Sequence, residues 1–397
     1  MSLLDYVLQS LGKMAFVSGP RQVGKTTLAR QYAAQRHGSQ YFNWDIVTDQ
    51  KKLLKTPYFF SEMPGAEHKL VIFDEIHKYA RWKNYLKGAY DGFASDYQFL
   101  VTGSGRLDLF KKGGDSLLGR YFSVPLFPLT IGELGHRAVS FAQFLHTVAS
   151  DLPERGDDDH LSQLMVFGGF PEPYVRQEQA FYRLWSAERR TLLIRGDIRD
   201  ATRIREMSLV EMLAHLIPER VGSPLSYNSL REDLGVAFET VRDWVQVLAQ
   251  FYYLFHVHPY RARLNRVLRK EAKVYLFDWA ELTEPGPRFE NLVALHLLKA
   301  TKTWQAAGEA DVGLYYLRDK EKREVDFVIT NGRQPACLIE VKLSDPEPSK
   351  ALWYFQERLE VPFAVQVVSQ TGVLKRYRQG KRILWVASAD QFLRCLP

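Results

Sequence analysis

Short apolar runs alternate with amphipathic segments along the first third of the chain. Residues 70–73 form an uninterrupted apolar run, which is typical of a strand buried on both faces of a parallel sheet. Residues 14–18 and 97–102 form similar runs, and residues 26–36 and 82–92 have the spacing of helices. Strands that alternate with helices predict an α/β fold with a doubly wound parallel sheet over about the first 130 residues.

The apolar spacing becomes helical after Pro128 and stays so until about residue 218. The clearest predicted helices cover 141–148 and 177–193. A Gly-Ser-Pro break at 222–224 follows, and residues 226–248 then have the pattern of a helix–turn–helix. This pattern separates a helical region from a small helix–turn–helix module.

The last part of the chain returns to a mixed pattern. Residues 289–298 predict an amphipathic helix, and residues 323–329 and 336–342 predict strands. The chain therefore divides into four predicted parts: an α/β core (1–135), a helical region (136–221), a winged-helix module (222–284) and a C-terminal α/β domain (285–397).

Composition places few further limits on the chain of 397 residues. Hydrophobic residues make up 46% and charged residues 25%, so large cores can form. The net charge of +7 favours a polyanionic partner, although only weakly at this length. Cys337 and Cys395 are the only cysteines, which excludes a disulfide framework. No apolar run approaches the ~20 residues of a membrane-spanning helix, and residues 1–18 lack a signal-peptide core, so we expect a cytoplasmic protein without membrane association.

A glycine-rich loop joins the first apolar run to the first predicted helix. Its residues fit the pattern Gly-x-x-x-x-Gly-Lys-[Ser/Thr] of the phosphate-binding loop, or Walker A motif. Glycines let successive N–H groups point at one anion, and the helix N-terminus adds its positive dipole. Lys25 can reach the terminal phosphates of ATP, and the Thr26 hydroxyl can ligate Mg²⁺. A plain Gly-Pro turn is the alternative, which the strand–loop–helix setting disfavours. The predicted nucleotide-binding residues are Gly19, Pro20, Arg21, Gln22, Val23, Gly24, Lys25, Thr26 and Thr27.

Acidic and hydroxyl residues stand at the ends of the next two predicted strands, where open α/β sheets place ligands. Asp74 is predicted to hold Mg²⁺ together with Thr26, and Glu75 to polarise the attacking water, as in a Walker B motif. A solvated acidic pair is the alternative. Thr102 or Ser104 can touch the γ-phosphate or the water, and an ordinary Gly-Ser turn is the alternative there.

The motifs Gly-Pro-Arg-Gln-Val-Gly-Lys-Thr, Phe-Asp-Glu-Ile, Thr-Gly-Ser and Leu-Leu-Gly-Arg follow one another along the chain. In this order they resemble a widespread prokaryotic family of predicted ATPases in the AAA+ superfamily. The resemblance implies a strand order of 5-1-4-3-2, a helical lid and a polar sensor near Ser104. It also implies that Arg120 is an arginine finger, which would make the protein a homo-oligomer. Pairing of Arg120 with a surface carboxylate is the alternative, and the turn reads Gly-Ser-Gly where the family more often has Gly-Ser-Ser.

The helix–turn–helix over 226–248 is followed by two predicted wing strands, 254–259 and 273–277. Its second helix carries Glu239 and Asp243, which repel a DNA duplex, so a packing module and a DNA reader stay open as alternatives. A basic cluster suited to phosphates lies between the wing strands: Arg261, Arg263, Arg266, Arg269 and Lys270.

A second constellation has the pattern Asp…Glu-x-Lys. Glu340 and Lys342 share one face of a predicted strand, and Asp326 can join them from the adjacent strand. Paired carboxylates can bind Mg²⁺ while the lysine orients or activates water. Together with Glu290 at the start of the preceding helix, the pattern resembles the PD-(D/E)xK restriction-endonuclease-like fold, with which the same ATPase family ends. The resemblance adds Gln356 as a supporting residue, whereas Asp278-Trp-Ala280 departs from the family pattern.

The hypothesis is a Mg²⁺-dependent ATPase of the AAA+ type, coupled to a nuclease-like domain that associates with DNA or RNA. The alternative is a nucleotide-switched binding module, in which an inactive nuclease-like domain grips a protein or a nucleic acid. A small-molecule kinase is disfavoured, because Glu75 directly after Asp74 fits hydrolysis of the nucleotide.

Overall fold

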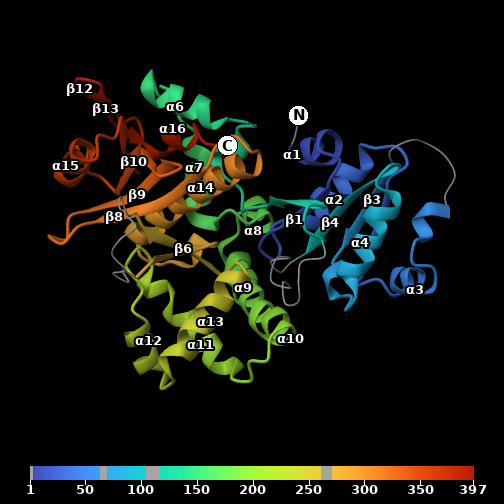
Figure 1. Cartoon of the computed structure of the whole chain (residues 1–397). Helices are drawn as coiled ribbons and strands as arrows, with labels where there is room; N and C mark the ends of the chain where they lie inside the picture. Colours follow the sequence, from blue (N-terminus) through green and yellow to red (C-terminus); the bar gives the residue numbers. More distant parts are fainter. Residues whose placement is uncertain (1–2, 63–68, 104–116, 137, 261–270) are drawn as a thin grey trace. The chain divides into compact units, whose positions relative to one another are not determined.

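The computed structural model describes residues 3–62, 69–103, 117–136, 138–260 and 271–397. The chain forms two compact units, residues 1–127 with 250–252, and residues 128–249 with 253–397. We describe each unit by itself (Figure 1). The predicted boundaries at 221/222 and 284/285 both fall inside the second unit.

The first unit contains a parallel sheet with the order β2-β3-β4-β1-β5, as far as its described residues go. This order confirms the predicted one, read from the opposite edge. The strands are β1 (Met14–Ser18), β2 (Gln40–Asn43), β3 (Lys69–Asp74), β4 (Tyr97–Gly103) and β5 (Tyr121–Pro125). The helices are α1 (Leu3–Asp5), η1 (Tyr6–Ser10), α2 (Lys25–Ala34), α3 (Val47–Lys55), η2 (Phe59–Glu62), η3 (Ile76–Lys78) and α4 (Trp82–Phe93).

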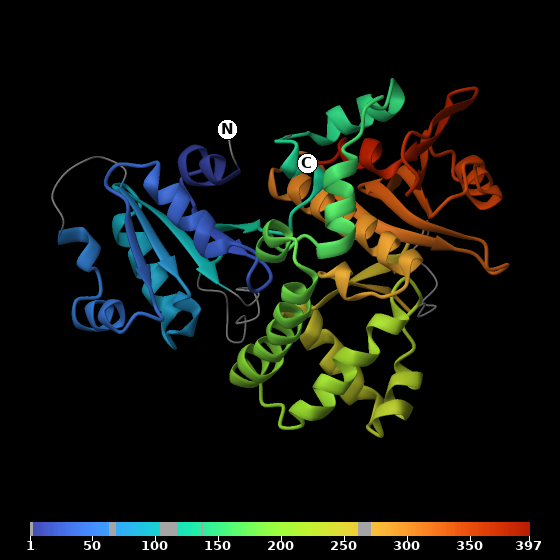
Figure 2. The same ribbon diagram turned by 180° about the vertical axis from the view of Figure 1, so that it is seen from behind.

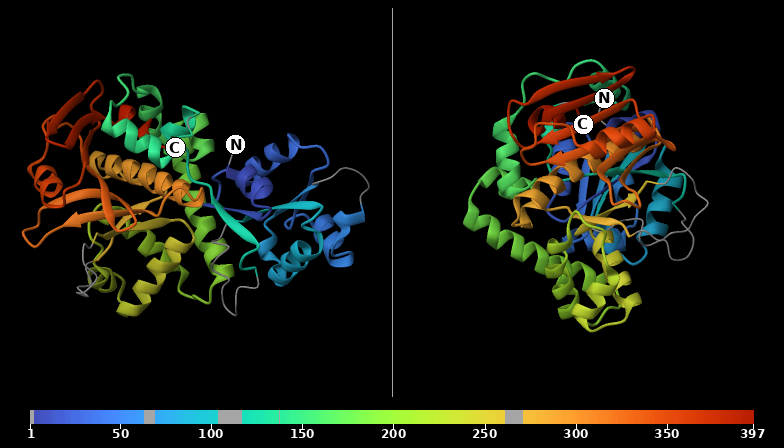
Figure 3. Two further views of the ribbon diagram at one scale, coloured as in Figure 1. Left: turned by 45° about the horizontal axis from the view of Figure 1, so that its top comes forward. Right: turned by 90° about the vertical axis from the view of Figure 1, so that its left-hand side faces the viewer.

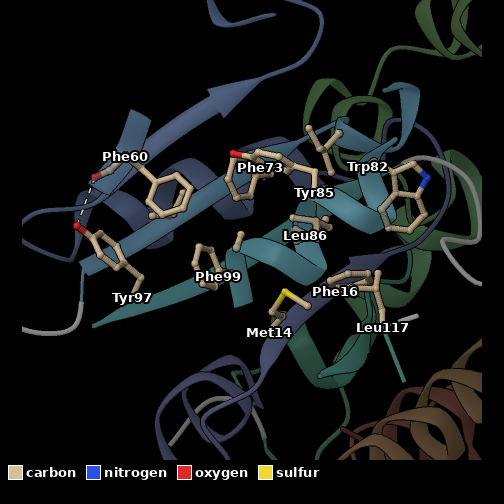
Figure 4. Packing of buried hydrophobic residues seen from close by; sticks show 14 of the residues in the cluster. Met14, Phe16, Phe60, Phe73, Trp82, Tyr85, Leu86, Tyr97, Phe99 and Leu117 are labelled. Carbon is tan, nitrogen blue, oxygen red and sulfur yellow. Dashed lines mark hydrogen bonds between the residues drawn. The ribbon is translucent and has the colours of Figure 1, made fainter. Parts of the chain in front are cut away.

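Alternate residues of the central strands pack on opposite helices, because successive side chains of a strand point to opposite faces. On β1, Met14 and Phe16 join a cluster with Leu86 of α4, whereas Ala15 and Val17 join a cluster with α2. Figure 4 shows the aromatic side of this arrangement. The sheet is thus covered on both faces, as a doubly wound α/β fold requires.

The second unit contains a mixed sheet with the order β12-β13-β11-β10-β9-β8-β6-β7 among its described residues. The strands are β6 (Leu254–Pro259), β7 (Lys273–Leu276), β8 (Val312–Arg318), β9 (Glu324–Asn331), β10 (Gln334–Lys342), β11 (Phe363–Val368), β12 (Leu374–Gln379) and β13 (Arg382–Ser388). The fold of the chain is therefore α/β, with a parallel sheet in the first unit and a mixed sheet in the second.

Helices make up the rest of the second unit, and α14 lies over its sheet (Figures 2 and 3). The helices are α5 (Ile131–Leu134), α6 (Phe141–Ala149), α7 (Asp158–Phe167), α8 (Pro171–Arg176), α9 (Gln179–Thr191), η5 (Leu192–Ile198), α10 (Arg199–Ala201), α11 (Met207–Leu216), η6 (Pro218–Arg220), α12 (Tyr227–Leu234), α13 (Phe238–Gln250), η7 (Trp279–Glu281), α14 (Pro285–Ala306), α15 (Lys350–Arg358) and α16 (Ala389–Leu393).

The predicted helix–turn–helix is present as α12 and α13. Ser226 caps α12 by accepting a hydrogen bond from the backbone N–H of Ser229, and Gly235 ends it in a left-handed conformation with φ of 66°. The hairpin of β6 and β7 follows, where the sequence predicted a wing. However, β6 also pairs with β8 through His258 and Pro259, so the hairpin is continuous with the C-terminal sheet.

The stretch Pro285-Gly-Pro287 begins α14 rather than preceding it. Proline is tolerated in the first turn of a helix, because the N–H groups there have no partner within the helix. The predicted helix over 289–298 is therefore the middle of a longer helix that ends at Ala306.

Candidate nucleotide site and a second carboxylate centre

The phosphate-binding loop connects β1 to α2, and it contains the residues predicted from 19 to 24. Gln22 and Gly24 have positive φ values of 63° and 100°, which turn the chain tightly before the helix begins at Lys25. A Cβ atom at Gly19 would lie 2.1 Å from the backbone oxygen of Leu126, so only glycine fits there. The loop therefore has the backbone that binds an anion at a helix N-terminus.

Lys25 lies across this loop. Its side chain is buried, and its Nζ donates hydrogen bonds to the backbone oxygens of Gly19 at 3.0 Å and Pro20 at 2.6 Å. The carbonyls of the loop thus hold the ammonium group next to the backbone that would bind a polyphosphate.

Asp74 lies at the end of β3 and is 1% exposed. Its Oδ2 accepts hydrogen bonds from the hydroxyls of Thr26 at 2.7 Å and Tyr41 at 2.6 Å, and its Oδ1 accepts one from Thr102. The structure thus brings together Thr26 and Asp74, the predicted metal ligands. A hydroxyl and a carboxylate are hard oxygen donors, and this donor set fits Mg²⁺ bound together with water and phosphate oxygens.

Tyr41 was missed from the sequence, although it lies in β2, the strand next to β3. Burial and the hydrogen bond to Asp74 raise the pKa of the Tyr41 hydroxyl to about 12, so Tyr41 is a neutral donor. A tyrosine in a short strand that pairs with the acidic strand is the signal that could have identified it.

Glu75 follows Asp74 with a left-handed backbone, φ 56°, and its N–H donates to the backbone oxygen of Thr102. Its carboxylate lies 3.3 Å from Nζ of Lys78 and 3.7 Å from Nε2 of His77. Burial lowers the pKa of His77, which favours the neutral imidazole. Burial alone would lower the pKa of Lys78, but its contacts with Asp45 and Glu75 raise it, so Glu75 is held by a charged lysine.

The predicted sensor, arginine finger and basic cluster have different outcomes. Ser104 lies outside the described residues, and so does the basic cluster between residues 261 and 270. Arg120 bonds to Asp91 through Nε at 2.6 Å and Nη2 at 2.9 Å, which is the alternative that the sequence left open.

The predicted residues of the C-terminal constellation lie on adjoining elements of the second unit. Nζ of Lys342 is 2.8 Å from Oε1 of Glu340 on the same strand, β10. Asp326 on β9 accepts a hydrogen bond from the backbone N–H of Val341 at 2.9 Å. Glu290 on α14 borders a cavity of about 290 Å³. Gln356, in contrast, donates to the backbone oxygen of Ile383 at 2.9 Å, on β13.

Lys273 links these carboxylates and was not predicted. Its Nζ lies 3.4 Å from Glu290, 2.6 Å from Glu324 and 3.4 Å from Asp326, and its side chain is 1% exposed. Tyr275, two residues along β7, donates a hydrogen bond to Glu290 at 2.7 Å. We call Lys273, Glu290, Glu324, Asp326, Glu340 and Lys342 the carboxylate centre.

Burial and mutual repulsion shift the protonation of this centre. Burial first, and then the charge of Asp326, raise the pKa of Glu290 and of Glu340 to about 7. Burial alone would lower the pKa of Lys273, but Glu290, Asp326 and Glu324 raise it above its ordinary value. Within the described ranges, no group of three or more His, Cys, Asp or Glu residues is arranged to hold a metal ion.

Comparisons with known proteins agree with the geometry of the first unit. Residues 12–135 match the family described as "AAA domain". Residues 158–282 and 285–391 each match a family described as a domain of unknown function. Over residues 12–135 the chain is thus similar to AAA domains, as the motifs predicted.

The chain is also similar to proteins described as uncharacterized. It is 22% identical over 357 residues to one from Haemophilus influenzae, covering 83% of this chain and 82% of that protein. It is 24% identical over 394 residues to one from Methanocaldococcus jannaschii, covering 87% and 79%. The similarity extends over most of both chains.

Solved structures show weaker similarity. The Aeropyrum pernix ORC1 protein in complex with DNA has a TM-score of 0.29 and 14% identity, covering 71% of this chain and 86% of that one. The Bacillus subtilis DNA clamp loader delta protein has a TM-score of 0.28 and 10% identity, covering 62% and 87%. No helix within the described residues is long and apolar enough to cross a membrane.

Proposed function

We propose that the first unit binds ATP with Mg²⁺ and hydrolyses it. The observation that carries this proposal is the hydrogen bond of 2.7 Å between Thr26 of the phosphate-binding loop and the buried Asp74. It joins the loop to the acidic end of β3, so a phosphate-binding group and a metal-binding group meet at one point.

Each residue of the site has a separate role in the proposed reaction. Lys25 would exchange its bonds with the loop carbonyls for bonds with phosphate oxygens. Thr26 and Asp74 would hold Mg²⁺, which neutralises phosphate charge in such sites. Glu75 would orient and polarise the attacking water, and Lys78 would hold Glu75 in place beside it.

Replacement of Glu75 by Gln tests this proposal. We expect ATP binding to persist and the release of phosphate to fall by ~10²–10⁴, the usual contribution of a general base. Glu62→Gln, which changes an exposed carboxylate of the same unit, is the matched control and should keep the wild-type rate. Normal turnover by Glu75→Gln would refute the assignment, and transfer of phosphate to a metabolite would establish a kinase instead.

A second candidate function concerns the second unit: attachment to DNA or RNA by a nuclease-like domain that does not cut. It is supported by the grouping of Glu340, Lys342 and Asp326 on neighbouring strands, and by the positive net charge of the whole chain, +7. The contacts of Lys273 with Glu290 and Asp326 favour nucleic-acid binding without cleavage, because a metal-dependent nuclease needs these carboxylate oxygens to bind its metal ion.

Mobility-shift and cleavage assays test this second candidate. We expect plasmid and single-stranded substrates to shift, and to stay intact with Mg²⁺ or Mn²⁺. Cleavage that is lost in Lys342→Ala would establish a nuclease, whereas cleavage that survives this change would point to a contaminant. The absence of any shift with DNA or RNA would favour a protein partner.

A further inference from the structure

The ammonium group of Lys273 lies among carboxylate oxygens as a cation would. Its contacts are Oε1 of Glu290 at 3.4 Å, Oε1 of Glu324 at 2.6 Å and Oδ1 of Asp326 at 3.4 Å. A lysine ammonium has as many N–H donors as there are carboxylates in this set. The group is thus matched to its surroundings in both charge and hydrogen bonding.

The backbone around Lys273 is fixed from two sides, so this placement follows from the sheet. On one side Val257 of β6 pairs with Lys273, and on the other Pro224 forms a bridge to it. The N–H groups of Gly222 and Leu225 donate to the backbone oxygens of Val274 and Ala272, on either side of Lys273. A buried lysine on such a strand cannot turn its head group to solvent without leaving its partners.

A divalent cation would compete with Lys273 for the same oxygens. Mg²⁺ requires oxygen ligands at about 2.0–2.1 Å in near-octahedral geometry, so an ammonium group and a metal ion cannot share these oxygens. The other oxygen of Asp326 already accepts the N–H of Val341. Among the described residues, Oε2 of Glu340 is buried without a hydrogen-bond partner, so it is an oxygen that a metal could take.

We propose that Lys273 is the resident cation of the carboxylate centre and that it takes the place of a divalent metal ion. This inference deepens the second candidate function, because it says why the domain would bind without cutting. A consequence is that removal of the Lys273 charge creates a metal site: Glu290, Asp326 and Glu324 lose their counter-charge, and Glu340 supplies a further oxygen.

The test is a titration of the full-length, nucleotide-free protein with Mn²⁺, in which electron paramagnetic resonance reports the free ion. We expect Lys273→Met, which keeps an unbranched side chain about one atom shorter, to bind an additional Mn²⁺ per chain relative to wild type. Lys375→Met is the matched control, because it removes the same charge from an exposed lysine of the same unit that pairs with Glu347, outside the carboxylate centre, and it should bind as wild type does. Asp74 and Thr26 are unchanged throughout, so the first unit contributes equally to each titration.

Equal Mn²⁺ binding by wild type and a folded Lys273→Met would overturn the proposal. If Lys273→Met does not fold, Glu340→Gln decides instead: a loss of bound Mn²⁺ relative to wild type would show that the native centre takes metal, and an unchanged count supports the proposal. If the wild-type protein binds no nucleic acid, the second candidate function is refuted. If it also binds no Mn²⁺ at this centre, the assignment of Lys273 as the resident cation is unaffected.

Discussion

Replacement of Gly19 by alanine should damage the nucleotide site without touching any charged group. The new Cβ would lie 2.1 Å from the backbone oxygen of Leu126 and 3.1 Å from its carbon. Leu126 cannot easily retreat, because its N–H donates to the backbone oxygen of Ser18, one residue before Gly19, at 2.7 Å. The clash must therefore be relieved by movement of the phosphate-binding loop itself.

The size of the effect follows from this overlap. Relief of a contact of 2.1 Å requires a shift of the loop by about 1 Å, and misplacement by that amount can reduce activity ~10²-fold. Overpacking of this kind costs about 1–3 kcal/mol of folding stability. We therefore expect Gly19→Ala to weaken ATP binding by about 10- to 100-fold, in line with the loss of one hydrogen bond to a charged group.

Isothermal titration calorimetry with ATP, alongside thermal unfolding, measures both quantities. Gly92→Ala is the matched control: it lies in α4 with nothing within 4 Å of the new Cβ, and it should keep ATP affinity and stabilise the helix slightly. Wild-type ATP affinity in a folded Gly19→Ala protein would refute the argument that this close approach shapes the loop.

Two further predictions concern charged groups. If Arg120 serves a neighbouring subunit, Arg120→Ala should lower ATP turnover at protein concentrations where light scattering shows oligomers. Asp91→Ala, which releases Arg120, should keep the wild-type rate. The same ATP turnover in Arg120→Ala and Asp91→Ala would exclude Arg120 as an arginine finger. Because burial and Asp326 raise the pKa of Glu340 from 4.5 to about 7, the folded state keeps a proton there that the unfolded state has lost. This stabilisation is complete below pH 4.5 and is lost as the pH rises through 7. The unfolding temperature should therefore fall between pH 5 and pH 8, and it should fall less in Glu340→Gln than in wild type. A drop of the same size in both proteins would contradict the prediction.

Local motifs explain what could be predicted from the sequence. The loop around Lys25 is contiguous, and strand ends such as that of Asp74 can be recognised from an apolar run followed by acidic residues. Because parallel strands bring their carboxyl ends to the same edge, the neighbourhood of Thr26 and Asp74 followed from the chain order alone.

The contacts of Lys273 could not be predicted in this way. Its partners Glu290 and Asp326 lie 17 and 53 residues away along the chain, and nothing in its local pattern distinguishes it from a lysine that begins an ordinary wing strand. Likewise, Tyr41 meets Asp74 across neighbouring strands rather than within a motif. Such contacts depend on the register of strands, which an apolar pattern does not determine.

The hairpin of β6 and β7 has a consequence for how this protein can diversify. The two families of unknown function meet between residues 282 and 285, yet β6 and β7 belong to the same sheet as β8. A recombination at that point would replace β6, the strand that pairs with β8. An unpaired edge of β8 would then favour aggregation. Recombination between relatives should therefore preserve the two families as one inherited block, with matching strands on both sides of the junction.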